Sequence, residues 1–312
     1  MPKISVVIPC YNARNTISKT LHSIAMQSIA EDVEIIIAND ADGLPYHDII
    51  SKFPELNIKF VVNEVNKGCS GARNLGIRNA SADFVFFLDA DDQLVSSISL
   101  EILYESIKAK NVDMLGSVFE SEVRTDKGVV IRKMEHQPTW CHGRIYRRQY
   151  LLDNNLFFNE KLRLNEDMEF HQLLFDMGAK VAEIPMVTVL WRDNPKSLTH
   201  ESLYKNKRTF VDACAEYIKD CNERGLMNER VVRRVLQNLV MIYFYYNVCL
   251  DECEDKADEF MSACREYWKL AEPIVADVPD ELVTKVYCGI AKTFEFIPSV
   301  GFIKFLNELR AG

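Results

Sequence analysis

Three acidic residues stand together after one short apolar run of the chain. Asp89, Asp91 and Asp92 follow residues 84–88, whose length and content of Phe, Val and Leu are typical of a buried strand. Carboxylates crowded at a strand end raise each other's pKa values unless a cation lies between them. Mg²⁺ and Mn²⁺ bind such carboxylates together with phosphate oxygens of a substrate. The spacing fits a metal and phosphate site, and it fits equally a solvated turn in which Asp91 or Asp92 caps the next helix.

A glycine-bearing segment before this strand supports the metal and phosphate interpretation. Residues 66–76 predict a turn that opens a helix, whose first amides can face an anion. Arg73 lies on that helix, where its guanidinium can reach a phosphate or the carboxylates at the strand end. The segment contains neither GxGxxG nor a Walker A sequence, so it does not favour a dinucleotide or P-loop site.

A second group of acids opens a predicted helix later in the chain. Glu166, Asp167 and Glu169 follow Asn165. The dipole and free amides of a first helical turn favour ionised carboxylates, so Asp167 is a candidate general base near neutral pH. The alternative is that these acids only stabilise the start of the helix, and the residues alone leave both interpretations open.

The elements that must position these groups lie in the first 200 residues. Short apolar runs alternate there with helical patterns, which indicates a parallel sheet covered by helices on both faces. The expected strands are residues 4–9, 34–40, 59–63 and 83–89, with further strands, some of them antiparallel, at 113–120, 129–133 and 180–192; the expected helices are residues 15–27, 70–80 and 97–110. Ligands of such sheets bind beyond the carboxyl ends of the strands.

The rest of the chain carries almost no strand signal. Amphipathic patterns predict helices at residues 203–224, 228–250, 256–271, 281–294 and 301–310. We therefore expect an α/β domain over residues 1–200 and an all-α region over residues 201–312.

The last predicted helix carries Phe302, Phe305, Leu306 and Leu309 on one face. This face can dock on the protein, pair two copies of the chain or lie on a membrane surface. We expect docking, because the polar face of the helix has too few basic residues for strong membrane binding.

Composition and charge exclude several classes of protein. The chain has 312 residues, 48% of them hydrophobic, which is enough for a sizeable core. Its formal charge of -9 argues against nucleic-acid binding driven by phosphate neutralisation. Nine cysteines without a CxxC pair favour a reducing compartment over a disulfide framework or a zinc ribbon. No signal peptide and no run of the ~20 apolar residues of a membrane span are recognisable, so we expect a cytoplasmic protein.

Taken together, the motifs of the first 200 residues resemble those of the family 2 glycosyltransferases. Their order and spacing match at residues 5–12, 34–40, 71–76, 87–92, 143–147, 165–167, 191–192 and 197–200. Each motif alone is weak, but the set is specific. The resemblance implies the GT-A fold, which is a nucleotide-sugar-binding α/β domain with a mostly parallel central sheet. It also implies transfer of a sugar with inversion. The helical remainder carries no motif of the family.

The resemblance implies a donor site at the strand ends. The residues carried over to it are Pro9, Tyr11, Asn12, Asp40, Arg73, Asp89 and Glu166. Pro9 and Tyr11 would border the nucleobase, and Asp40 would accept a hydrogen bond from the uracil N3–H, which adenine lacks. Arg73 would lie near the uracil or the phosphates, and Asp89 would contact the ribose.

The resemblance also implies a metal site and a general base. Mn²⁺ or Mg²⁺ would be held by Asp91 with Asp89, and some family members complete the site with a histidine in the region of His200; the alternative for His200 is a lone surface histidine. Asp167 matches the base that takes the proton of the acceptor hydroxyl. The metal would offset the charge that develops on the leaving diphosphate.

The chain departs from the family pattern after the second strand. Asn39 stands where the first acid of the usual Asp-Asp-Gly-Ser lies, and Ala41 and Asp42 replace Gly-Ser. Asp40 remains, so we expect nucleoside binding to be kept with a less certain choice of uracil. Trp140 fits a platform on which an acceptor sugar stacks, and it fits a packed core residue equally well.

From the resemblance we expect an inverting, metal-dependent glycosyltransferase. It would move a hexose or N-acetylhexosamine, most simply from a UDP-sugar, to a polysaccharide or lipid-linked oligosaccharide at the cytoplasmic face of a bacterial inner membrane. Peripheral contact with that membrane and a homodimer through the C-terminal helices are compatible with this role. The sugar, the acceptor, the linkage and the oligomeric state stay open.

Two other functions are compatible with parts of the sequence. A sugar-phosphate nucleotidylyltransferase shares the α/β domain and the metal carboxylates, but residues 9–12 lack its glycine-rich basic loop. A degenerate nucleotide-sugar-binding or scaffold protein would act through its helical C-terminal region. Asn39 and Ala41 favour it, and the joint retention of the acids at positions 89, 91, 166 and 167 disfavours it.

Overall fold

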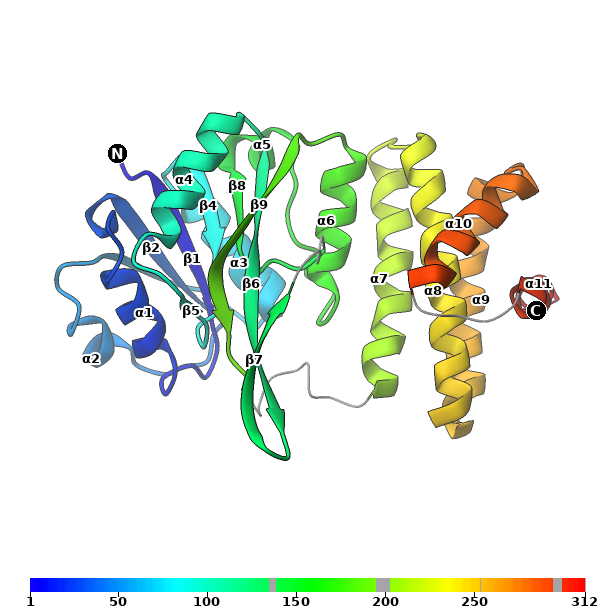
Figure 1. Cartoon of the computed structure of the whole chain (residues 1–312), viewed down its shortest axis with the longest axis horizontal. Helices are drawn as coiled ribbons and strands as arrows, with labels where there is room; N and C mark the ends of the chain where they lie inside the picture. The colour runs from blue at the N-terminus through cyan, green and yellow to red at the C-terminus, as the bar shows by residue number, and fades with distance from the viewer. Residues whose placement is uncertain (135–138, 195–202, 253, 294–298, 312) are drawn as a thin grey trace. The chain divides into compact units, whose positions relative to one another are not determined.

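The computed structural model describes residues 1–134, 139–194, 203–252, 254–293 and 299–311. The chain divides into two compact units, Met1–Ser197 and Leu198–Gly312. The first unit is a mixed α/β structure and the second consists of helices (Figure 1).

Four parallel strands make up one half of the sheet. Their bounds are Ile4–Cys10 for β1, Val33–Asn39 for β2, Asn57–Val62 for β3 and Phe84–Phe87 for β4, in the order β3-β2-β1-β4. Runs of Val, Ile and Phe form β1, β2 and β4, and these strands are buried almost throughout because helices cover both faces. These four strands were expected from the sequence.

The other half of the sheet mixes directions. It continues from β4 through β8 (Arg144–Arg147), β6 (Met114–Thr125), β9 (Val181–Trp191) and β5 (Gln93–Leu94). Strand β8 runs antiparallel to both β4 and β6, whereas β6 and β9 are parallel. Strand β7 (Gly128–Met134) pairs with β6 in a hairpin that projects beyond the other strands of the sheet (Figure 1).

Short helices join and cover the strands of the first unit. Their bounds are Ile17–Ala25 for α1, Ala30–Asp32 for the 3-10 helix η1, His47–Ile50 for α2, Gly68–Asn79 for α3, Ser99–Lys110 for α4, Arg148–Asp153 for α5 and Glu166–Asp176 for α6. Helix α1 shows how they attach: Ile17, Leu21 and Ile24 recur at helical spacing and are fully buried in the core of the sheet.

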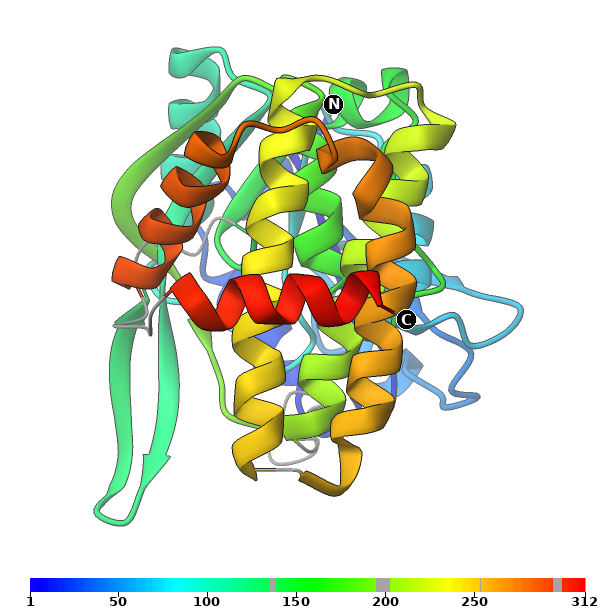
Figure 2. The same cartoon turned by 90° about the vertical axis from the view of Figure 1, so that its right-hand side faces the viewer.

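The second unit is a bundle of long helices. Their bounds are Leu203–Glu223 for α7, Glu229–Glu252 for α8, Glu254–Lys256 for the 3-10 helix η3, Ala257–Val275 for α9, Asp280–Thr293 for α10 and Ser299–Arg310 for α11. Helix α11, red in Figure 2, crosses α8 and α9. Phe302 and Phe305 are buried, with ring centroids 5.4 and 5.3 Å from that of Tyr243, so the apolar face of the last helix docks within this unit as expected.

None of the described helices is long and apolar enough to cross a lipid bilayer.

Candidate active site

The carboxyl ends of three neighbouring strands form the floor of the candidate active site. Strands β2, β1 and β4 are adjacent and parallel, so the residues that follow them reach one edge of the sheet. Tyr11 follows β1, Asp40 follows β2 and Asp89 lies just beyond β4. Ligands of open α/β sheets bind at this edge.

Arg73 joins two of the expected site residues. It lies on α3, and its Nη1 donates to Glu166 Oε1 at 2.8 Å while its Nη2 donates to Asp89 Oδ1 at 3.2 Å. The guanidinium side chain is only 5% exposed, so these charges interact with little screening by water. Arg73 thereby links the start of α6 to the end of β4.

Asp167 lies next to Glu166 in the first turn of α6. Asn165 precedes the helix in the left-handed conformation, at φ +62°, which asparagine adopts more easily than most residues. The Oδ1 atom of Asp167 accepts a hydrogen bond from the backbone N–H of Met168 at 2.8 Å. Burial raises the pKa of Asp167, although the positive charge of Arg73 and the field of His142 oppose the rise. A carboxylate with a raised pKa is a better proton acceptor.

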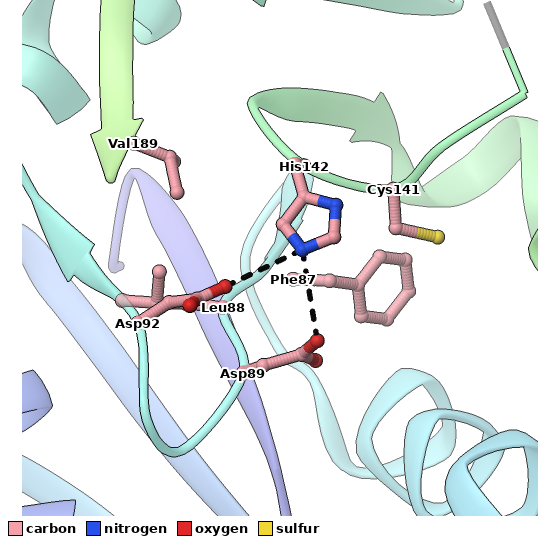
Figure 3. Close-up of a pocket in the computed structure, with 7 residues that line it drawn as sticks. All are labelled: Phe87, Leu88, Asp89, Asp92, Cys141, His142 and Val189. Carbon is pink, nitrogen blue, oxygen red and sulfur yellow. Dashed lines mark ion pairs between the residues drawn. The ribbon is translucent and has the colours of Figure 1, made fainter. Parts of the chain in front are cut away.

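His142 lies between two carboxylates at the end of β4. Its Nε2 atom is 3.4 Å from Asp92 Oδ2 and 3.9 Å from Asp89 Oδ2 (Figure 3). A tight turn places the ring: Gly143 has φ +69°, and a Cβ there would lie 2.6 Å from Ser117 Oγ. The imidazole also stacks on Phe119 with ring centroids 5.0 Å apart.

The atoms of this cluster suit a divalent cation. Asp89, Asp92 and His142 each offer one ligand atom, and the three atoms lie within 4.8 Å of one another. Within the described parts of the chain, Asp92 Oδ2 and both ring nitrogens of His142 are buried and have no hydrogen-bond partner. Burial raises the pKa of Asp92, which His142 opposes. A cation at this cluster would satisfy Asp92 Oδ2 and His142 Nε2 and keep the carboxylates ionised.

Asp91 is hydrogen-bonded to a residue outside this cluster. Its Oδ2 accepts a hydrogen bond from Asn194 Nδ2 at 2.7 Å, and burial followed by the charge of Asp89 raises its pKa. The expected role of Asp91 as the direct metal ligand therefore stays a prediction. His200 lies outside the described residues.

Asp40, which is expected to bind the nucleobase, already accepts three hydrogen bonds within the protein. Asp40 Oδ1 accepts from Asn63 Nδ2 at 2.8 Å and from the Lys67 N–H at 2.9 Å, and its Oδ2 accepts from the Gly68 N–H at 2.7 Å. The side chain is buried and fixes the start of α3. These three hydrogen bonds occupy most of the about four lone-pair sites of the carboxylate, so binding of a base N–H by Asp40 stays a prediction.

The departure from the family motif has a clear structural effect. Asp42 accepts from the Asn12 N–H at 2.8 Å, the Leu44 N–H at 2.9 Å, Tyr46 Oη at 2.7 Å and Asn39 Nδ2 at 2.9 Å. Burial alone would raise the pKa of Asp42, but these hydrogen bonds outweigh it and lower the pKa. Asp42 thus ties the loop after β2 to the turn after β1.

That turn presents an open aromatic surface. Asn12 holds φ +52°, and Tyr11 beside it is 55% exposed at the sheet edge. Pro9 lies in β1 and is partly buried. Exposure leaves the Tyr11 ring free to stack on a planar base, which agrees with its expected place beside a nucleobase.

Aromatic side chains surround His142 on the other side of the cluster. Trp140 stacks on Phe119 at 5.6 Å and meets Trp191 edge to face at 5.9 Å. Trp140 is only partly buried, so both the core and the platform interpretations keep support. The small pocket beside these rings is lined by Phe87, Leu88, Asp89, Asp92, Cys141, His142 and Val189 (Figure 3).

Residues 5–161, about half of the chain, match the family described as glycosyl transferase family 2. The chain belongs to glycosyl transferase family 2. Among its relatives in this family, the uncharacterized glycosyltransferase EpsJ of Bacillus subtilis is 29% identical over 220 residues, which make up 64% of this chain and 63% of EpsJ.

A second relative in the family is an Escherichia coli enzyme, the UDP-Glc:alpha-D-GlcNAc-diphosphoundecaprenol beta-1,3-glucosyltransferase WfgD. It is 31% identical over 117 residues, which cover 38% of this chain and 46% of WfgD. The chain therefore spans less than two thirds of the length of either relative.

Several solved structures resemble almost the whole chain. The Staphylococcus aureus TarS fragment in complex with UDP-GlcNAc has a TM-score of 0.66 at 18% identity, covering 99% of this chain and 92% of the fragment. At this identity the likeness concerns the fold. It confirms the GT-A fold with a helical C-terminal region that was expected from the sequence.

Several residues of this family 2 site were not predicted from the sequence. His142 had no assigned role because it lies in a loop, and its two carboxylate neighbours are about 50 positions away. Asp92 was expected either among the crowded carboxylates at the strand end or as a helix cap, without an assigned role as a metal ligand; it is fully buried, and its Oδ1 accepts from the Arg192 N–H at 2.9 Å. The sequence signals for these two residues were limited to the Asp-Asp repeat at 91–92 and the position of His142 before Gly143.

Proposed function

We propose that this protein is an inverting glycosyltransferase that moves a hexose or N-acetylhexosamine from a nucleoside diphosphate sugar to a hydroxyl of an acceptor glycan. Arg73 carries the proposal, because it holds the helix of the candidate base against the carboxylates at the end of β4. A donor bound at the strand ends would then have the base on one side and the carboxylate cluster on the other.

Asp167 has the proton-transfer role in this reaction. Its carboxylate takes the proton of the acceptor hydroxyl while that oxygen attacks the anomeric carbon. The new glycosidic bond forms as the bond from the anomeric carbon to the diphosphate oxygen breaks, and the nucleoside diphosphate leaves with the bonding electrons. Attack opposite the leaving group inverts the configuration at that carbon.

Asp89, Asp91, Asp92 and His142 are the residues that would hold Mn²⁺ or Mg²⁺. The buried atoms of Asp92 and His142 without hydrogen-bond partners among the described residues support this set, and Asp91 is included because it lies in the same turn. A bound cation supplies positive charge next to the leaving diphosphate. Burial and then the charges of Asp89 and Asp91 raise the pKa of Asp92, and a cation between the carboxylates would offset the effect of these charges.

The donor is a UDP-sugar and the acceptor a glycan or lipid-linked oligosaccharide in this proposal. The WfgD name includes both UDP-Glc and a diphosphoundecaprenol-linked acceptor, and the TarS fragment is in complex with UDP-GlcNAc. Pro9 and Tyr11 border the nucleobase, Asp40 accepts a hydrogen bond from its N–H, and Asn12 belongs to the same donor site. Such an acceptor would bring the protein to the cytoplasmic face of the inner membrane. Peripheral contact there and pairing through the C-terminal helices belong to the proposal as well.

Calorimetry with a panel of nucleotides tests the donor half of the proposal. UDP, GDP, CDP, dTDP and ADP are titrated into the protein with Mn²⁺ and again with a chelator. We expect UDP to bind most tightly and only with the metal. Asp91→Ala and His142→Ala should each weaken that binding by more than about tenfold, because each removes a side chain that is proposed to bind the metal or to orient its ligands.

Asp126→Ala is the matched control, since Asp126 lies in the exposed turn of the β6–β7 hairpin, away from the strand ends. Its UDP affinity should equal that of the wild type. A folded protein that binds none of the nucleotides would contradict the proposal and favour the scaffold function. Equal metal-dependent binding in His142→Ala would remove His142 from the cation site.

A further inference from the structure

A buried hydrogen-bonded pair lies behind the candidate base. His171 is on the same helix as Asp167, one turn later, and its Nδ1 is 2.6 Å from the main-chain oxygen of Asp167. Its Nε2 is 2.8 Å from the hydroxyl of Tyr146, which lies in β8. Both side chains are fully buried, so water does not compete for these bonds.

The chemistry of the groups fixes the direction of both hydrogen bonds. A carbonyl oxygen can only accept, so the His171 Nδ1 carries a hydrogen and donates it to Asp167. Burial, followed by the charge of Arg144, lowers the pKa of His171 to about 3, although hydrogen bonds with the backbone of Asp167 and of Thr139 raise it, and the ring is therefore neutral with that single N–H. The Nε2 atom therefore accepts, and the Tyr146 hydroxyl donates to it.

The surroundings of His171 would suit an apolar side chain. The rings of Phe170, Phe175 and Tyr146 lie with centroids 5.4, 6.0 and 5.9 Å from the imidazole. Polar groups in such a place cost free energy unless they make good hydrogen bonds. The imidazole is therefore explained by its hydrogen bonds with Asp167, Tyr146 and the backbone of Thr139, and not by packing.

These bonds connect α6, which carries Asp167, to the part of the sheet that leads into Asp89. Tyr146 is the register partner of Val85 in β4, the strand that leads into Asp89. It is also paired with Met114 of β6, so the backbone that carries its side chain lies between two strands of the sheet. The bond from Tyr146 to His171 thus fixes the first turn of α6 relative to β4 from inside the core, while Arg73 does so at the sheet edge.

We infer that His171 and Tyr146 are positioning residues that hold Asp167 at its working distance from the anomeric carbon. The inference rests on the proposed function. The pair touches neither donor nor acceptor. It acts through the main chain of Asp167, whose carboxylate is otherwise oriented by the N–H of Met168. A displacement of a catalytic group by about 1 Å can cost as much as a hundredfold in rate, so loss of either bond would lower kcat.

Hydrolysis of UDP-GlcNAc in the presence of Mn²⁺ measures this effect without an identified acceptor, because water takes the place of the acceptor hydroxyl. Tyr146→Phe removes only the hydroxyl, and His171→Leu removes both bonds. We expect kcat to fall by roughly ten- to a hundredfold in each, with KM for the donor within about twofold of wild type. Because the two residues act as one unit, the double variant should fall no further than His171→Leu.

Two conservative variants separate the bonds. His171→Asn places an amide near the position of Nδ1 and can keep the bond to Asp167, whereas His171→Gln reaches the position of Nε2 and can accept from Tyr146. We expect His171→Asn to recover more of kcat than His171→Gln, since the bond to Asp167 is the one nearer the base. The ¹⁵N shifts of His171 should show the Nδ1–H tautomer without any turnover.

Leu174→Ala is the matched control, because it removes a fully buried side chain of α6 that takes no part in these bonds. It should lower the melting temperature at least as much as Tyr146→Phe and leave kcat unchanged. Full kcat in Tyr146→Phe and His171→Leu would overturn the inference, as would equal kcat losses in Leu174→Ala. A wild type that releases no UDP from any sugar donor would instead contradict the proposed function.

Discussion

Arg73 contacts two acidic residues of the site and affects the pKa of a third. Its guanidinium is buried between Glu166 and Asp89, and its charge lowers the pKa of Asp167 against the effect of burial. Arginine at this position was predicted from the sequence to face phosphates or carboxylates. The structure shows the carboxylate contacts, which depend on two segments 16 and 93 positions away from it.

The pH dependence of turnover follows from Asp167. The base works only when ionised, and burial raises its pKa, so kcat should fall as the pH drops through a value above the usual range of about 4 for aspartate. Arg73→Met removes a charge that lowers this pKa, so the acidic limb should move to higher pH. pH–rate profiles of the wild type and of Arg73→Met, both at saturating Mn²⁺, compare the two acidic limbs. An acidic limb of Arg73→Met that does not move, or that moves to lower pH, would argue against Asp167 as the base.

Removal of the Arg73 charge should also reduce stability. Arg73→Met leaves Glu166 buried without its partner, which costs about 3 kcal/mol of the free energy of unfolding in comparable pairs. Arg14→Met is the control, because Arg14 pairs with Asp48 at the surface and its loss should be too small to resolve. Urea unfolding of both variants gives the comparison, and equal losses would show that burial of the Arg73 pair has no special effect.

Elements with a marked apolar or helical pattern were predictable from the sequence, and elements without one were not. Runs of β-branched residues marked β1 and β2, and helical spacing marked α1 and α4, because burial imposes those patterns on many consecutive positions. Strand β8 has only four residues, with an arginine at each end, so no pattern marks it. Yet β8 carries Tyr146 and lies at the centre of the sheet.

The site contacts that could not be predicted from the sequence are those between different elements of the fold. Asp89, Arg73, Glu166 and Asp167 were predicted from motifs, since each follows a strand end or opens a helix. The His142 cluster depends on how β4 and β8 align, and the bond from Tyr146 to His171 depends on how α6 packs on β8. Such alignments are properties of the fold and leave no local signal.

Helix α3 must approach β1 closely to carry Arg73 to the sheet edge. Gly76 permits the approach, because a Cβ there would lie 2.1 Å from Val7 Cγ1. We expect Gly76→Ala to lower the free energy of unfolding by about 1–3 kcal/mol through overpacking. Gly289 in α10 has open space around its Cβ position, so Gly289→Ala should instead gain about 0.5–1 kcal/mol from helix propensity. Urea unfolding tests both signs, and a stabilising Gly76→Ala would disprove the close packing.

At the scale of the whole molecule, the α/β unit holds every candidate site residue that the structure describes. Unit Met1–Ser197 contains the strand ends, Arg73 and α6, and the family match lies within it. The helical unit buries its own aromatic residues, including the face of α11 that could otherwise have paired two copies. Membrane contact and dimerisation through this unit stay predictions.

Turnover of UDP-sugars, with the configuration of the released sugar followed by proton NMR, tests the central claim most directly. With Mn²⁺ the wild type should release UDP from an α-linked donor such as UDP-GlcNAc or UDP-Glc and form the β product first. Asp167→Asn should keep UDP binding and lose kcat by about a hundredfold or more. An α product, or an Asp167→Asn variant as active as the wild type, would contradict inverting transfer with Asp167 as the base.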